Sequence, residues 1–113
     1  MHELSLCRAL IDQLQQQAAV SGFSRVTQIW LEVGVLAAVV PEAMQFGFEA
    51  ASHGTLAQGA QLHIIRLPAE AYCRACGVKT DIQQRYQPCP HCGEFQLEVV
   101  SGETLSVREL EVE

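Results

Sequence analysis

Residues 73–92 read CRACGVKTDIQQRYQPCPHC and contain two Cys-x-x-Cys motifs that twelve residues separate. A Cys-x-x-Cys turn can direct two sulfurs at one point, and two such turns facing each other supply four thiolates in a tetrahedron. Zn(II) favours this arrangement, with Zn–S distances of about 2.3 Å. The spacing therefore predicts a closed zinc site whose ligands are Cys73, Cys76, Cys89 and Cys92.

Other interpretations of these four cysteines are a pair of disulfides, a redox-active Cys-x-x-Cys pair and an iron site. The chain has five cysteines, and an odd number with metal-ligand spacing fits a reducing cytosol better than a disulfide scaffold. The fifth, Cys7, lies in a helical pattern and is expected to be a small core residue. We therefore expect zinc, although the site itself does not indicate what the protein does.

The charge of the chain argues against a nucleic-acid partner. Its 13 acidic and 7 basic side chains give a net charge of −6, whereas zinc ribbons that bind nucleic acid usually carry a basic face. No apolar run approaches the roughly 20 residues that cross a bilayer, and no signal-peptide pattern follows Met1. We expect a cytoplasmic protein with no nucleic-acid and no membrane partner.

Apolar periodicity predicts two helices and three strands outside the cysteine region. Helical spacing begins near Leu4 and stops at Ser21-Gly22, and Pro41-Glu42 is a typical start for a second helix. Residues rich in β-formers predict strands at 25–33, 61–67 and 104–112. In the first of these strands one face is apolar and is expected to be buried: Ile29, Leu31 and Val33.

These elements predict an α+β fold, in which a small three-stranded sheet carries two helices on one face. Two strands alone would be marginal, so the last strand is expected to return to the sheet after the cysteine region. The four-cysteine, zinc-ribbon-like segment is therefore an insertion. We expect one α/β domain made of residues 1–68 and 102–113, and a zinc-binding subdomain of residues 69–101.

A second metal position is indicated at the N-terminus, where His2 follows Met1. The α-amine has a pKa of about 7.7–8.0 and can lose its proton to a metal near neutral pH. The amine, the amide nitrogen of His2 and its imidazole can then close fused chelate rings, which suits Ni(II) and Cu(II). Glu3 offers a further amide nitrogen or a carboxylate. A histidine at position two also occurs by chance, so these residues alone leave the site open.

The other three histidines carry weaker signals. His53 lies near a helix end and His63 alternates along a strand, so both are expected to be structural or surface residues. His91 lies between two zinc cysteines, where a solvated position is expected, and it is also placed to be a spare ligand.

The sequence resembles the HypA/HybF family of hydrogenase-maturation nickel chaperones. The Met-His-Glu start and the zinc spacing are specific in combination, whereas either feature alone is not. The resemblance covers essentially the whole chain, including the helix–strand order. It is carried by Met1-His2-Glu3-Leu4-Ser5-Leu6-Cys7, Trp30-Leu31-Glu32-Val33-Gly34, the two Cys-x-x-Cys motifs and Glu109-Leu110-Glu111-Val112-Glu113.

The resemblance implies a nickel metallochaperone and not an enzyme, with the α/β domain binding nickel. Nickel is then a transiently bound cargo on His2, beside the Met1 amine and the backbone nitrogens of His2 and Glu3. The four cysteines hold a structural zinc. A partner GTPase and the large subunit of a [NiFe]-hydrogenase are the implied partners, and some members also assist urease. In some members a histidine near the zinc cysteines responds to nickel or pH, and His91 is its counterpart here.

Two competing hypotheses come from other functional classes. The first is a zinc-ribbon adaptor for nucleic acid or a transcription complex, against which the acidic charge and the lack of stacking aromatic residues count. The second is a thiol-redox enzyme, which would need a reactive, metal-free thiolate. The sequence also leaves open whether an edge strand pairs with a second copy to form a homodimer.

Overall fold

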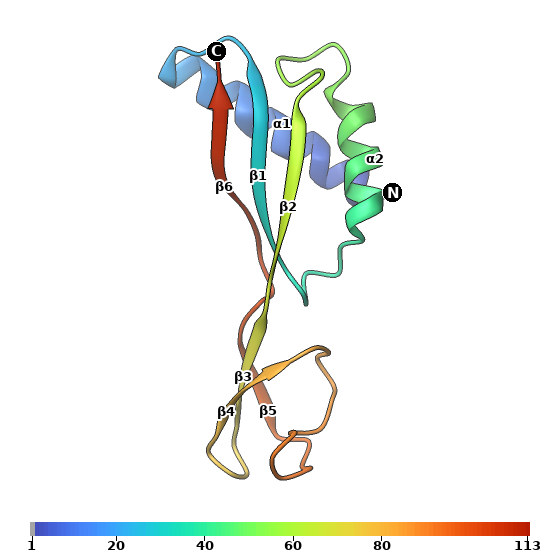
Figure 1. The fold of residues 1–113 in the computed structure, drawn as a ribbon, viewed down its shortest axis with the longest axis vertical. Coiled ribbons are helices and arrows are strands. Elements are labelled where there is room, and N and C mark those ends of the chain that lie inside the picture. The colour runs from blue at the N-terminus through green and yellow to red at the C-terminus, as the bar shows by residue number, and fades with distance from the viewer. Residues whose placement is uncertain (1) are drawn as a thin grey trace. The chain divides into compact units, whose positions relative to one another are not determined.

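The computed structural model describes residues 2–113, which form two helices and six strands (Figure 1). The five elements expected outside the cysteine region are all present, and the α+β class is confirmed. In chain order the elements are α1 (His2–Ser21), β1 (Val26–Gly34), α2 (Pro41–Ser52), β2 (Gln61–Leu67), β3 (Ala69–Cys73), β4 (Lys79–Ile82), β5 (Leu97–Ser101) and β6 (Leu105–Val112).

Glycine and proline set the helix ends at the predicted places. Gly22 follows α1 with a φ of 83°, and its amide donates to the Ala18 carbonyl at 2.9 Å. Glycine adopts this left-handed conformation without the steric penalty of a β-carbon. Pro41 begins α2, where the missing amide proton costs no helical hydrogen bond.

The first sheet has the strand order β2-β1-β6, so the last strand does return beside β1. The cysteine region is therefore inserted between β2 and β6, as expected. The amide and the carbonyl of Glu113 bond to Arg25, at 3.3 Å or less, and the Thr27 hydroxyl donates to the Glu111 carbonyl at 3.0 Å. These contacts join the C-terminal end of the chain to the beginning of β1.

Apolar side chains from β1 and the two helices are fully or almost fully buried. In Figure 1, α1 crosses behind the three strands of this sheet, and α2 packs against α1. Burial of one large aliphatic side chain contributes about 1.5–3 kcal/mol, so a set of this size holds the helices to the sheet. The buried set includes Cys7, Leu10, Ile11 and Leu14 of α1, Ile29, Leu31 and Val33 of β1, and Met44 and Phe48 of α2.

A second antiparallel sheet, of order β4-β3-β5, was not predicted. Its strands are only four or five residues long, and although side chains of β3 alternate between buried and more exposed positions, β4 and β5 carry no clear apolar alternation. Pairing between distant segments stabilises them instead. Four buried side chains form the core beneath this sheet: Leu36, Ala69, Ala71 and Ile82.

Contacts divide the chain into two compact units. The first contains the chain up to Leu31, Val39–Ile64 and Val107–Glu113, and the second contains Glu32–Ala38 and Ile65–Ser106. The sequence predicted a different division, into a nickel-binding domain of residues 1–68 and 102–113 and a zinc-binding subdomain of residues 69–101. Because that division is defined by metal binding, it stays a prediction. Neither helix in residues 2–113 combines the length and the apolar character needed to cross a membrane.

Candidate metal centres

The four cysteines of the two Cys-x-x-Cys motifs converge on one point. All four Sγ atoms lie within 4.8 Å of one another, with Cys73 and Cys92 separated by 3.6 Å and Cys76 and Cys89 by 3.8 Å. Four sulfurs at about 2.3 Å from a tetrahedral zinc would be about 3.8 Å apart. The cysteines therefore fit a structural zinc, as the spacing predicted. No other group of three metal-ligating side chains gathers within residues 2–113.

Two similar turns bring the sulfurs together. Cys73 is the last residue of β3, and its carbonyl accepts a hydrogen bond from the Gly77 amide at 2.8 Å; the Cys89 carbonyl accepts one from Gly93 at the same distance. Both glycines have positive φ, 76° and 78°, which lets each turn close directly after its second cysteine. Cys73 and Cys89 are buried, whereas the second cysteine of each pair is exposed.

The thiols are free and suited to metal binding. Sulfurs separated by 3.6 Å or more are not disulfide-bonded, because that bond is about 2.05 Å long. Loss of solvent opposes ionisation of Cys89, but the amides of Cys92 and His91 and the neighbouring thiols lower its pKa to about 7. The thiolate of Cys89, which is the form that binds metal, is therefore accessible near neutral pH. The Glu94 amide lowers the pKa of Cys92, but loss of solvent and the neighbouring thiols outweigh it and raise that pKa to about 12. His91 itself is exposed, and a ligand role for its ring stays a prediction.

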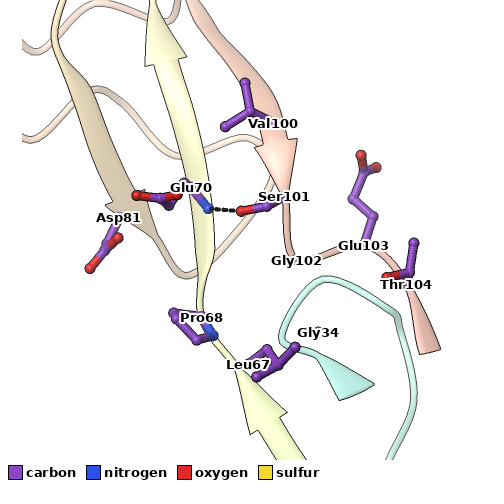
Figure 2. Close-up of a pocket in the computed structure, with 10 residues that line it drawn as sticks. All are labelled: Gly34, Leu67, Pro68, Glu70, Asp81, Val100, Ser101, Gly102, Glu103 and Thr104. Carbon is purple, nitrogen blue, oxygen red and sulfur yellow. Dashed lines mark hydrogen bonds between the residues drawn. The ribbon is translucent and has the colours of Figure 1, made fainter. Parts of the chain in front are cut away.

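A separate hollow of about 520 Å³ lies near the ends of β3 and β5 but lacks the character of a metal site. Figure 2 shows its lining residues, with the Glu70 amide donating to Ser101 Oγ at 3.2 Å. Glu70 also pairs with Lys79 at 3.5 Å, and Glu103 pairs with Arg85. Two of its carboxylates thus already have cationic partners on the chain itself.

The N-terminal candidates lie at the beginning of α1. Met1 falls outside the described residues. His2 is the first residue of the helix and is exposed, and Glu3 is half-buried. The Val40 amide donates to Glu3 Oε2 at 3.2 Å. This bond is the largest of the influences that lower the pKa of the Glu3 carboxyl.

His53, His63 and Cys7 lie at the surface, strand and core positions that the sequence predicted for them. His63 Nε2 is 2.7 Å from Gln28 Oε1, and its ring stacks on Trp30 with the centroids 4.9 Å apart. His53 follows the last residue of α2 and is exposed. Cys7 is fully buried, and burial, followed by the nearby Glu3 carboxylate, raises its pKa to about 11.

Comparison with known proteins identifies relatives over the full length of the chain. Residues 1–112 match the HypA family model, described as a hydrogenase/urease nickel-incorporation metallochaperone. Hydrogenase maturation factor HypA of Azotobacter chroococcum and HypA 2 of Bradyrhizobium diazoefficiens are each 48% identical to it over 113 residues, covering all of both chains. The solution structure of the Ni metallochaperone HypA from Helicobacter pylori has the same fold, with a TM-score of 0.69, 19% identity, and coverage of 97% of this chain and 96% of that one.

Proposed function

This chain belongs to the HypA family of nickel-incorporation metallochaperones, which act in hydrogenase maturation, and on that premise we propose that it binds Ni(II) at its N-terminus. The proposed ligands are the imidazole of His2, the Met1 amine and the backbone nitrogens of His2 and Glu3. The ion is a cargo, which the protein delivers to the large subunit of a [NiFe]-hydrogenase.

The observation that carries this proposal is the exposure of His2 at the first position of α1. The first amides of an α-helix have no carbonyl partner within the helix. The Glu3 amide donates to its own carboxylate and not to a carbonyl of the helix, so nickel can engage the amide nitrogens of His2 and Glu3 without breaking a hydrogen bond between helical turns. Nitrogen ligands of this kind suit Ni(II), and an exposed site permits both loading and release.

The hydrogen bond of the Glu3 carboxylate favours the backbone nitrogen of this residue, and not its side chain, as the nickel ligand. Because its carboxylate accepts the Val40 amide at 3.2 Å, it already has a partner within the folded chain. We therefore propose that Glu3 contributes its amide nitrogen to nickel and that its carboxylate fixes the turn from which that nitrogen projects.

The four cysteines are proposed to hold zinc permanently, because two of them are buried and the set is complete without an external ligand. Residues 69–101 would then be the zinc-binding subdomain, and residues 1–68 with 102–113 the nickel-binding domain. We further propose that the protein is a carrier without catalytic activity, that it works in the cytoplasm, and that an accessory GTPase of hydrogenase maturation assists transfer. A homodimer would be compatible with these roles.

Metal analysis and nickel titration of untagged protein test the proposal. The wild type should contain one zinc and bind one nickel. Replacing His2 with Ala, or adding one residue before Met1, should abolish nickel binding and leave zinc in place. His53→Ala is the matched control, because it removes another exposed histidine from the same compact unit. Full nickel affinity in the His2→Ala protein would refute the N-terminal site.

A further inference from the structure

α2 contacts the backbone of the first turn of α1 at Gly47, which is buried within α2. A β-carbon on Gly47 would lie 3.3 Å from the Leu4 α-carbon and 3.4 Å from the Leu4 amide nitrogen. The first distance is tighter than most contacts of a β-carbon and the second lies at the lower limit of ordinary van der Waals contact. Both neighbours are backbone atoms, so a rotamer change cannot relieve the contact and the first turn of α1 would have to shift by a few tenths of an ångström. Glycine at this position therefore lets the two helices approach without that shift.

A second contact holds the next turn of α1 to the same helix. Cys7 Sγ would be 3.5 Å from a β-carbon on Gly47, and the Cys7 thiol donates to the Met44 carbonyl at 3.5 Å. The side chains of Cys7 and Met44 are both fully buried. The beginning of α1 therefore contacts α2 at two successive turns, through Leu4 and Cys7.

Helix ends normally fray, because their terminal groups lack partners within the helix. Packing of Leu4 against Gly47 opposes fraying at the end of α1 that carries His2. It also places the Leu4 amide nitrogen against α2, where the neighbouring helix restricts the approach of a metal ion. The amide nitrogens of residues 2 and 3 lie before this contact.

We propose that Gly47 is a positioning residue for nickel binding: by letting α2 contact the Leu4 backbone, it holds the metal-binding turn in place and ends the set of backbone ligands at Glu3. This inference rests on the proposed N-terminal nickel site. Its energetic basis is preorganisation, because conformational freedom lost on folding need not be lost again when the ion binds.

Nickel titration of Gly47→Ala and Gly47→Val, in the untagged full-length protein, tests the inference. The added methyl groups push the first turn away from α2, so the nickel Kd should rise about three- to tenfold for Ala and further for Val. The ligand-field absorption of bound Ni(II) should change as well. Ala50→Val is the control, because it adds two carbon atoms, between the one added by Gly47→Ala and the three added by Gly47→Val, at an exposed position of α2, and it should leave both readouts unchanged.

Comparing the nickel Kd and absorption spectrum with Tm and zinc content separates a loss of positioning from a loss of folding. Alanine is a better helix former than glycine, so Gly47→Ala should lose nickel affinity without a matching fall in Tm or zinc content. If the variant is less stable, adding Cys7→Ala relieves the sulfur contact but leaves the Leu4 contact, and nickel binding should stay weak. Wild-type Kd and spectrum in Gly47→Ala would overturn the inference. Nickel binding that survives His2→Ala would instead overturn the N-terminal site on which the inference depends.

Discussion

A β-carbon on Gly34 would overlap the carbonyl group of Gly102, because the backbones of these two residues are in direct contact. Two hydrogen bonds between the same two segments hold this backbone contact in place. The Gly34 amide donates to the Thr104 carbonyl and the Leu36 amide donates to the Gly102 carbonyl, each at 2.9 Å. Gly102 in turn has a φ of 95°, and a β-carbon there would overlap Ala69. Three segments of the second unit thus meet where no side chain fits.

Gly34→Ala should destabilise the protein by about 2 kcal/mol or more, because the new methyl group collides with backbone atoms that cannot change rotamer. Urea unfolding followed by circular dichroism measures this loss. Gly54→Ala is the control, since Gly54 has open space around its β-carbon position and only its φ of 77° to strain. Equal losses in the two variants would show that the Gly34–Gly102 contact is not the cause.

Removal of zinc should expose four thiols while Cys7 stays protected. With a chelator present under native conditions, a thiol reagent should modify the four cysteines of the two Cys-x-x-Cys motifs before Cys7, because the turns that hold them open once the metal is gone. Cys7 should react only on unfolding, because it is buried and its pKa is about 11. Mass spectrometry of the labelled cysteines reports this order. Early labelling of Cys7 would contradict the packing of α1 on α2.

The Cys7 thiol should make stability fall at alkaline pH. Its folded-state pKa of about 11 is above the ordinary value of 9.0, so the unfolded state loses this proton first and unfolding becomes easier as the pH rises from 9 to 11. The contribution is complete below pH 9. Comparison of wild type with Cys7→Ala, by urea unfolding at pH 8 and pH 10.5, isolates it. The stability difference between the two proteins should shrink by about 1–2 kcal/mol at the higher pH; an unchanged difference would contradict the assignment.

Glu3→Gln should bind nickel with an affinity close to that of the wild type. The glutamine amide oxygen can still accept the Val40 amide, and the backbone nitrogen of residue 3 is unaltered. Glu3→Ala removes the acceptor and should bind nickel more weakly than Glu3→Gln. Calorimetric titration of both variants makes the comparison. Strong loss of binding in Glu3→Gln would instead identify the carboxylate as a nickel ligand.

Much of the first unit could be predicted because its signals are local. The periodicity of α1, Pro41 at the start of α2 and the buried face of Ile29, Leu31 and Val33 depend only on neighbouring residues. The second sheet could not be predicted in this way. The register that sets Ala71 opposite Thr80 and Val99 involves three separate segments. β3 alternates between buried and more exposed side chains, but an alternation over five residues does not specify which segments pair with it.

The amino-acid sequence was sufficient to indicate the four candidate zinc ligands and the N-terminal candidates, because ligand chemistry depends on residue type and short spacing. The convergence of Cys73, Cys76, Cys89 and Cys92 then agreed with that spacing. Gly34 and Gly47 had no such local signal. The first ends a strand and the second lies inside a helix, and the atoms that a β-carbon would meet there, at Gly102 and Leu4, are distant in the chain. Only the packed structure brings those backbones within contact distance, and steric exclusion then leaves no room for a β-carbon at Gly34 and little room for one at Gly47.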